Sequence, residues 1–162
     1  MIERTLVVIK PDGVKRGLVG EIIRRIERTG LKIVSMKMIW ADKDFAKKHY
    51  FDVEERHGKT VFESLVGYLT EGPVIAICFE GVSAISLVRK IVGDTYPDKA
   101  NPGTIRGDFC HISKEYANKN KKRVGNLIHA SANAKEAKTE LALWFSVDEI
   151  HTYKTSHQDE VF

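Results

Sequence analysis

A histidine, His129, stands within the stretch NLIHASA at residues 126–132. Apolar residues precede it and small residues follow it, so we expect a buried strand that ends in a tight turn with His129 at its tip. There a neighbour can bind one ring nitrogen while the other faces solvent, and a neutral imidazole is a nucleophile near pH 7. The competing interpretation is a strand-end histidine satisfied by backbone contacts.

A carboxylate partner for His129 is available further along the chain, at Glu140. Ala137 and Trp144 mark the buried stripe of the helix expected there, and position 140 falls inside that stripe. A partly buried carboxylate needs a donor, and an imidazole N–H would fix the tautomer of His129 and leave its other nitrogen free to attack. The alternative is a partly exposed Glu140 that pairs with Lys138.

Cationic and hydroxyl side chains that suit phosphate oxygens occur at Arg89, Thr95 and Arg106. Lys10 follows a buried strand and cannot easily join the core, so we expect it to point into a cleft or toward a partner. The alternatives are helix-dipole stabilisation by Arg89, an ion pair between Arg106 and Asp108, and a solvated Lys10. No P-loop and no GxGxxG motif occurs, so any nucleotide is held in another way.

Length and composition bound the class of protein. A chain of 162 residues with 43% hydrophobic and 30% charged residues is expected to form one globular domain, residues 1–162. No signal-peptide pattern and no apolar run of membrane length occurs, and the two cysteines form no CxxC, so we expect a reduced, cytoplasmic protein without a membrane partner. Residues 111–125 form a basic segment whose charge equals the whole net charge of +4.

Hydrophobic periodicity and turn residues predict the elements that position these side chains. Strands are expected at residues 5–9, 31–40 (with a bulge at 34–35), 73–79 and 126–130. Helices are expected at residues 18–28, 42–50, 60–69, 83–92 and 133–145, with Asp42 and Thr60 as two of the N-caps. Residues 10–13 are expected to form a turn, and residues 94–107 a long irregular loop.

This order of elements predicts an α/β (α+β) fold of the ferredoxin-like βαββαβ type. We expect a four-stranded antiparallel sheet covered by helices on one face, with a helical hairpin inserted between the second and third strands.

Several motifs together resemble those of nucleoside diphosphate kinases. They are IKPDGV at residues 9–14, RGLVGEII at 16–23, His49-Tyr50, PGTIRGDFC at 102–110 and NLIHAS at 126–131. The match runs in order over nearly the whole chain. The resemblance implies a ping-pong phosphotransferase in which His129 takes the terminal phosphoryl group of a nucleoside triphosphate and passes it to a nucleoside diphosphate.

The resemblance also implies a role for each matching residue. Glu140 and Ser131 orient His129, Lys10 and Asn126 hold the ribose hydroxyls, Arg89, Thr95 and Arg106 hold the phosphates, Tyr50 lines the site, and Val61 and Leu65 belong to the nucleotide site. It implies Mg²⁺ held by the nucleotide phosphates rather than by protein ligands. The implied partners are ATP, GTP and other nucleoside di- and triphosphates, together with further copies of the chain in a hexamer, or alternatively a tetramer or dimer.

The sequence departs from the family pattern at three places. Val61 replaces the usual phenylalanine that stacks on the base, after a short lengthening at residues 57–59. Ala130 and Ala132 replace the usual glycine and aspartate, and the basic segment 111–125 is longer than is common. An alternative function is therefore a non-catalytic nucleotide- or nucleic-acid-binding relative that uses this segment, and salt-dependent DNA binding that survives His129→Ala would favour it.

The basic segment either extends the positive field over the site or packs between subunits, and the hypothesis tested first is that it strengthens nucleotide capture by its electrostatic field. Replacement of Lys119, Lys121, Lys122 and Arg123 by serine should then raise KM, most strongly at low salt because salt screens such fields. Steady-state kinetics at two ionic strengths measures the effect, and an unchanged KM would contradict the expectation.

Overall fold

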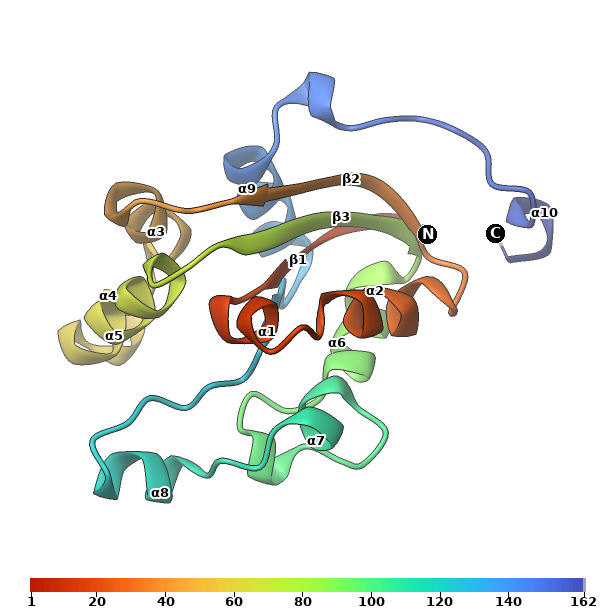
Figure 1. The fold of residues 1–162 in the computed structure, drawn as a ribbon. Helices are drawn as coiled ribbons and strands as arrows, with labels where there is room; N and C mark the ends of the chain where they lie inside the picture. Colours follow the sequence, from red (N-terminus) through yellow and green to blue (C-terminus); the bar gives the residue numbers. More distant parts are fainter. Residues whose placement is uncertain (162) are drawn as a thin grey trace.

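The computed structural model describes residues 1–161 (Figure 1). Its strands are β1 (Ile2–Ile9), β2 (Lys32–Ile39), β3 (Val74–Val82) and β4 (Ile128–Ala130). Its helices are α1 (Pro11–Lys15), α2 (Val19–Glu27), α3 (Lys43–His49), α4 (Val53–His57), α5 (Lys59–Thr70), α6 (Ala84–Val92), α7 (Ile105–Phe109), α8 (Lys114–Lys119), α9 (Ala134–Trp144) and α10 (Gln158–Val161), with 3₁₀ turns η1 (Pro97–Lys99) and η2 (Val147–Glu149).

The sheet has the predicted topology. Its strands lie in the order β2-β3-β1-β4 and all pair antiparallel, as the ferredoxin-like plan requires. In β4, His129 pairs with Val8 of β1, so the short last strand is positioned by an inner strand of the sheet.

Helices cover both faces of the sheet, so the expectation of helices on one face is wrong. Leu6 and Val8 of β1 pack with residues of α3, α5 and α9, whereas Val7 and Ile9 pack with residues of α2 and α6. Successive side chains of a strand point to opposite faces, and the uninterrupted apolar run of β1 supplies both layers. The inserted helical hairpin and α9 form the second layer.

Other predicted elements need local correction. Residues 10–13 do not form a simple turn, because Pro11 occupies the first turn of α1, where a missing N–H costs nothing. Thr60 lies inside α5, whose N-cap is Gly58 with φ +85°, and the extra helix α4 precedes it. Residues 94–107 contain η1 and the start of α7 rather than only irregular loop.

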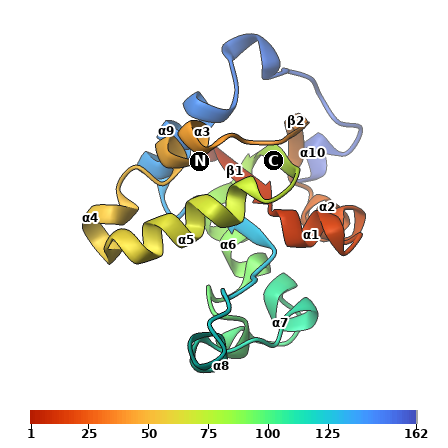
Figure 2. The ribbon, with the colours of Figure 1, turned by 60° about the vertical axis from the view of Figure 1, so that its left-hand side comes forward.

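Three local predictions are confirmed, whereas the last strand begins at Ile128 and not at residue 126. The Asp42 carboxylate accepts from the Phe45 N–H at the start of α3, the β2 register shifts between Ile33 and Ser35, and α6 ends at Gly93. Helices α7 and α8 lie apart from the sheet at the bottom of both views (Figures 1 and 2). Among residues 1–161 no helix is long and apolar enough to cross a membrane.

Candidate active site

A γ-turn at Leu127 positions the residues that flank it. Leu127 has φ +65°, and the Ile128 N–H donates to the Asn126 carbonyl at 2.7 Å. A leucine with positive φ is strained, so other contacts must stabilise the turn. The Lys10 N–H donates to the Leu127 carbonyl at 2.8 Å, and the Asp12 carboxylate accepts from the Leu127 N–H at 3.2 Å.

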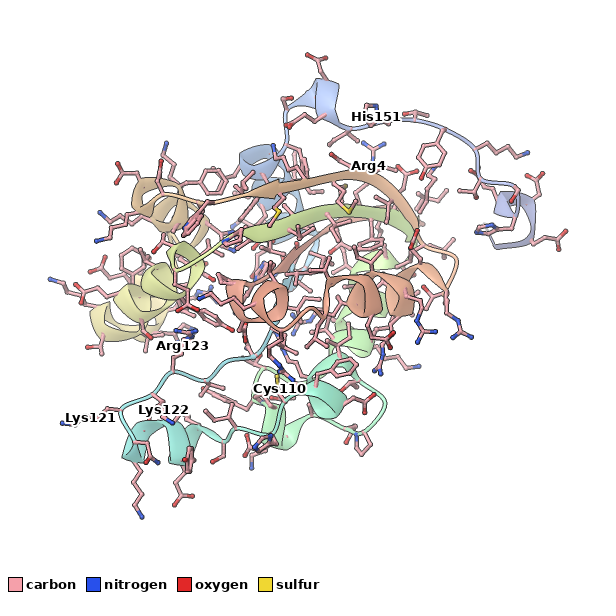
Figure 3. All side chains as sticks on the ribbon, in the orientation of Figure 1. Arg4, Cys110, Lys121, Lys122, Arg123 and His151 are labelled. Atoms are coloured by element: carbon pink, nitrogen blue, oxygen red, sulfur yellow. The ribbon has the colours of Figure 1, made fainter. Side chains whose placement is uncertain are left out.

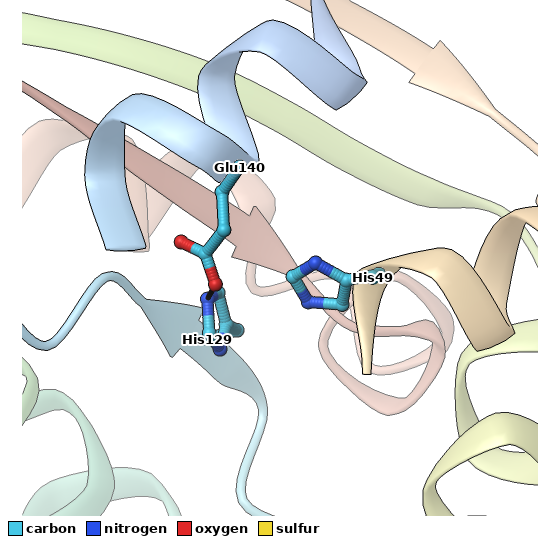
Figure 4. Close-up of side chains that lie close together, drawn as sticks. All are labelled: His49, His129 and Glu140. Atoms are coloured by element: carbon cyan, nitrogen blue, oxygen red, sulfur yellow. Dashed lines mark hydrogen bonds and ion pairs between the residues drawn. The ribbon is translucent and has the colours of Figure 1, made fainter. Parts of the chain in front are cut away.

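His129 and Glu140 form the predicted pair (Figure 4). His129 Nε2 lies 2.8 Å from Glu140 Oε1, and the Ser131 hydroxyl donates to Glu140 Oε2 at 2.5 Å. Because an ionised carboxylate only accepts, the proton of His129 lies on Nε2 and the Nδ1 lone pair is free. Burial raises the pKa of Glu140, but the charge and hydrogen bond of His129 and the Ser131 bond outweigh it and lower that pKa overall.

His129 lines a cavity of about 220 Å³. Most of the predicted site residues line the same cavity, namely Lys10, Tyr50, Leu65, Arg89, Thr95, Arg106 and Asn126. The buried Tyr50 hydroxyl has no hydrogen-bond partner among the described residues, so it is available to a ligand. Glu140 and Ser131 support His129 without being part of the lining.

Arg106 is buried, and its guanidinium donates to backbone carbonyls rather than to a carboxylate. Its Nε–H donates to the Asn126 carbonyl, its Nη1 to the Gly93 and Asp94 carbonyls, and its Nη2 to the Ile128 carbonyl. The alternative ion pair between Arg106 and Asp108 is not formed, because Asp108 accepts from Arg25 and from the Gly103 N–H.

The backbone bonds of Arg106 limit the number of N–H groups that it can offer to a ligand. A guanidinium has five N–H groups, and the four carbonyl bonds leave one N–H of Arg106 for a ligand in this arrangement. Arg106 therefore cannot bind phosphate as a bidentate fork without breaking a backbone bond. Arg89 is exposed on the last turn of α6 and lines the same cavity, and its guanidinium forms no ion pair within residues 1–161.

Lys10 is a second buried cation in the cavity. Its ammonium donates to Asn126 Oδ1 at 2.8 Å and lies 4.7 Å from the centre of the Tyr68 ring. Burial and, after it, the charge of Arg106 lower the pKa of Lys10 to about 7. The Asn126 amide also donates to the Thr95 carbonyl at 3.0 Å, so these residues form one polar network.

The basic segment is only partly free. Arg123 forms an ion pair with Glu71, the C-cap of α5, and lies 4.3 Å from the centre of the Tyr68 ring. Figure 3 shows Lys121 and Lys122 at the outer end of α8, with Arg123 further along the segment toward α5. Lys121 and Lys122 line a separate groove against α5 rather than the cavity of His129.

Sequence reasoning and structure differ at the edge of the site. Leu65 lines the cavity, whereas Val61, one helical turn earlier on α5, is 43% exposed and does not line it. Glu136 also lines the cavity. Its carboxylate accepts from the Ala132 N–H at 3.1 Å, while the Asn133 side chain caps the Glu136 N–H, so Glu136 does not compete with Glu140 for His129.

The sequence analysis gave no role to His49. Its place in the apolar stripe of α3, three residues after Ala46, could have indicated that it is buried. The nitrogens of His49 and His129 and a Glu140 oxygen lie within 4.8 Å of one another, a grouping that sequence spacing did not indicate. The Trp144 N–H donates to His49 Nδ1 at 3.2 Å, so the proton lies on Nε2 and His49 has no lone pair there for a metal ion.

Together, the α+β fold and the carboxylate-bound histidine in a cationic cavity define a class of enzymes that use a histidine side chain to act on anionic substrates. A model of the nucleoside diphosphate kinase family matches residues 3–150. The chain is 44% identical over 162 residues to the nucleoside diphosphate kinase of Borreliella burgdorferi, covering 99% of this chain and 97% of the relative.

Solved structures of nucleoside diphosphate kinases are also similar to this chain. A transition state mimic of nucleoside-diphosphate kinase from Borrelia burgdorferi with bound vanadate and ADP has a TM-score of 0.95 at 44% identity, covering 99% of this chain and 96% of that chain. A halophilic nucleoside diphosphate kinase from Halobacterium salinarum in complex with CDP has a TM-score of 0.86 at 39% identity, covering 100% and 99%.

The chain therefore belongs to the nucleoside diphosphate kinase family. It is a phosphotransferase that moves the terminal phosphoryl group of a nucleoside triphosphate to a nucleoside diphosphate through a phosphohistidine. The alternative of a non-catalytic binding protein is not favoured.

The two arginines should respond differently to substitution by lysine. Arg106→Lys loses the fork that spans four carbonyls and should destabilise the protein by about 2–4 kcal/mol, or about 5–12 °C in Tm. Arg89→Lys should change stability by less than about 0.5 kcal/mol and instead raise KM. Thermal unfolding without nucleotide tests the difference, and equal Tm values for the two variants would contradict it.

Lys10 should give kcat/KM an alkaline limb. An amine is charged below its pKa, so the free enzyme should lose this cation as pH rises through about 7. We expect kcat/KM for nucleoside triphosphate to fall by up to about tenfold per pH unit above that point. Lys10→Arg is the control, since a guanidinium stays charged, and persistence of the same limb in this variant would refute the assignment.

Proposed function

We propose that His129 is the residue that carries the phosphoryl group in this chain. The observation that supports it is the His129–Glu140 hydrogen bond, which leaves the Nδ1 lone pair free at the wall of a cationic cavity. In this proposal Nδ1 attacks the terminal phosphorus of a nucleoside triphosphate. An N–P bond forms, the P–O bond to the departing nucleoside diphosphate breaks, and a second diphosphate later takes the group by the reverse step.

The cations of the cavity would neutralise the charge on the transferring group. Arg89 has its full set of donors available, Thr95 offers a hydroxyl at the exposed start of the following loop, and Arg106 adds a fixed positive charge with one spare N–H. Since phosphoryl transfer requires mainly positioning and charge neutralisation, these groups would supply most of the catalysis.

The remaining lining residues would hold the nucleoside. Lys10 and Asn126 are already joined by a hydrogen bond and would bind the ribose hydroxyls together, and Tyr50 would offer its unpaired hydroxyl beside His129. Leu65 and, further out, Val61 would contact the base. Contacts of this kind do not depend on base identity, which suits an enzyme that exchanges phosphate among all nucleotides.

Magnesium would accompany the nucleotide phosphates. Mg²⁺ prefers oxygen ligands, and of the cavity side chains only Glu136 is a carboxylate, already engaged by the Ala132 N–H. The donor set therefore fits an ion held by phosphate oxygens rather than by the protein. When bound, it would withdraw charge from the transferring group.

The first experiment is brief incubation with γ-labelled ATP and Mg²⁺, followed by stability tests of the protein-bound label. We expect an acid-labile, alkali-stable label that GDP discharges and that His129→Ala does not acquire. Glu140→Gln should slow labelling by about 10²-fold, because the amide keeps one acceptor oxygen but lacks the carboxylate charge that strengthens the bond from His129 Nε2–H. Label retained in His129→Ala, or none on folded wild-type protein, would overturn the assignment.

We propose that the chain assembles with copies of itself, as a hexamer first and as a tetramer or dimer otherwise. β2 is an edge strand, and Met36 and Met38 on one of its faces are 54% and 57% exposed, with Trp40 directly after the strand 68% exposed. Light scattering should show a multiple of 18.3 kDa for the wild type and a smaller mass for Met38→Glu. Tyr116→Glu on α8, away from the sheet, is the control.

Two further proposals concern organisation. Residues 1–162 would form one domain, supported by the family match over residues 3–150 and by two core layers that share β1. A cytoplasmic location is supported by the free thiols of Cys78 and Cys110, which suit a reducing compartment, and cell fractionation would test it.

A further inference from the structure

His49 is a buried histidine beside the reacting histidine, and it comes from a different element. It ends α3, is 6% exposed, and its ring centre lies 4.7 Å from that of His129 at an angle of 83° (Figure 4). It belongs neither to the cavity lining nor to any role derived so far. An ionisable ring held this close to the reacting group must either be kept uncharged or take part in its proton balance.

Trp144 determines which of these occurs. An indole N–H only donates, so the Trp144 bond of 3.2 Å requires a lone pair on His49 Nδ1 and places the single proton of His49 on Nε2. A second proton would have to occupy Nδ1, directly opposite the Trp144 N–H. Burial and, next, the charge of His129 also oppose it and lower the pKa of His49 to about 3.

The groups that face His49 explain why its charge matters. They are His129 of β4, Glu140 of α9, Lys10 at the end of β1 and the neighbouring Tyr50. Glu140 is the anion among them, and it fixes the tautomer of His129. A positively charged His49 would compete with His129 for this carboxylate. An uncharged His49 does not, and its Nε2 has no partner among the described residues.

We propose that His49 is a positioning residue for phosphoryl transfer, held by Trp144 in the uncharged Nε2-protonated tautomer so that it packs at a right angle against His129 without competing for Glu140. This inference rests on the proposed role of His129 as the nucleophile. Trp144 acts through His49 and has no contact with the substrate cavity, so it too positions rather than reacts.

Trp144→Phe separates the hydrogen bond from the packing, because phenylalanine keeps an aromatic ring but lacks the donor. Without the donor, the pKa of His49 should rise. The rate of enzyme phosphorylation at saturating ATP should then show an acid limb about one pH unit higher than in the wild type. KM should stay within about twofold, since the cavity is untouched. The double variant Trp144→Phe/His49→Phe should lose the shift, because position 49 then has no titratable ring.

Phe45→Leu is the matched packing control. Phe45 contacts Trp144 edge-on at 4.8 Å but makes no bond to His49, so this variant should lower Tm without moving the acid limb. An acid limb at the wild-type position in Trp144→Phe, or a shifted limb that persists in the double variant, would overturn the proposal.

NMR of the histidine ring nitrogens in the wild-type protein tests the same idea without any variant. We expect His49 to show the Nε2–H tautomer and no second protonation down to about pH 5. A His49 that titrates near its ordinary value of about 6.5 would overturn the proposal even where Trp144→Phe does not fold. Failure of the proposed function is distinguishable, because it would appear as absent label on the wild type or as label on His129→Ala.

Discussion

The strained turn at Leu127 is the constraint on which the site depends. It reverses the chain directly before β4, so that Asn126 faces Lys10 while His129, two residues beyond the turn, faces Glu140. A leucine keeps this unfavourable conformation only because groups from other elements bind its neighbours. Arg106 holds the carbonyls on both sides of the turn, and the first turn after β1 binds Leu127 itself. The strained turn is thus stabilised by Arg106 and Lys10, which also line the cavity.

A second property follows from how Arg106 and Lys10 are satisfied. Both are buried cations whose hydrogen bonds go to neutral oxygens, the backbone carbonyls and the Asn126 amide. Burying such charges without a carboxylate hydrogen-bonded to them costs stability, and the cost appears in their lowered pKa values of about 10 for Arg106 and about 7 for Lys10. The charges of the cavity are therefore positioned for an anion by the fold itself, which is electrostatic preorganisation.

Local patterns in the sequence predicted much of this molecule. The heptad-like stripe around Ala137 and Trp144 placed Glu140 on the buried face of α9, and the alternation of β2 revealed its bulge. The motifs around residues 102–110 and 126–131 identified the family. These features depend on neighbours within one helical turn or one strand, where spacing determines direction.

What the sequence could not predict depends on long-range packing. The acceptors of Arg106 are carbonyls, which every residue carries, so no residue type marked them in advance. The uninterrupted apolar run of β1 fits helices on both faces, but the side on which the inserted hairpin packs depends on the whole topology. The hydrogen bond of Trp144 to His49 joins residues far apart in sequence, and only the folded protein brings them together.

The dispersal of the site along the chain has a consequence for folding. Its residues run from Lys10 at the end of the first strand to Glu140 on the helix that follows the last strand, so no fragment made during synthesis contains a complete site. A ligand that needs all of them binds the fully folded chain and not the unfolded one. Nucleotide at a hundred times its dissociation constant would add about 2.7 kcal/mol to the stability of the whole molecule. The cellular nucleotide pool would thus protect this enzyme from proteases, and depletion of nucleotides would shorten the lifetime of the protein.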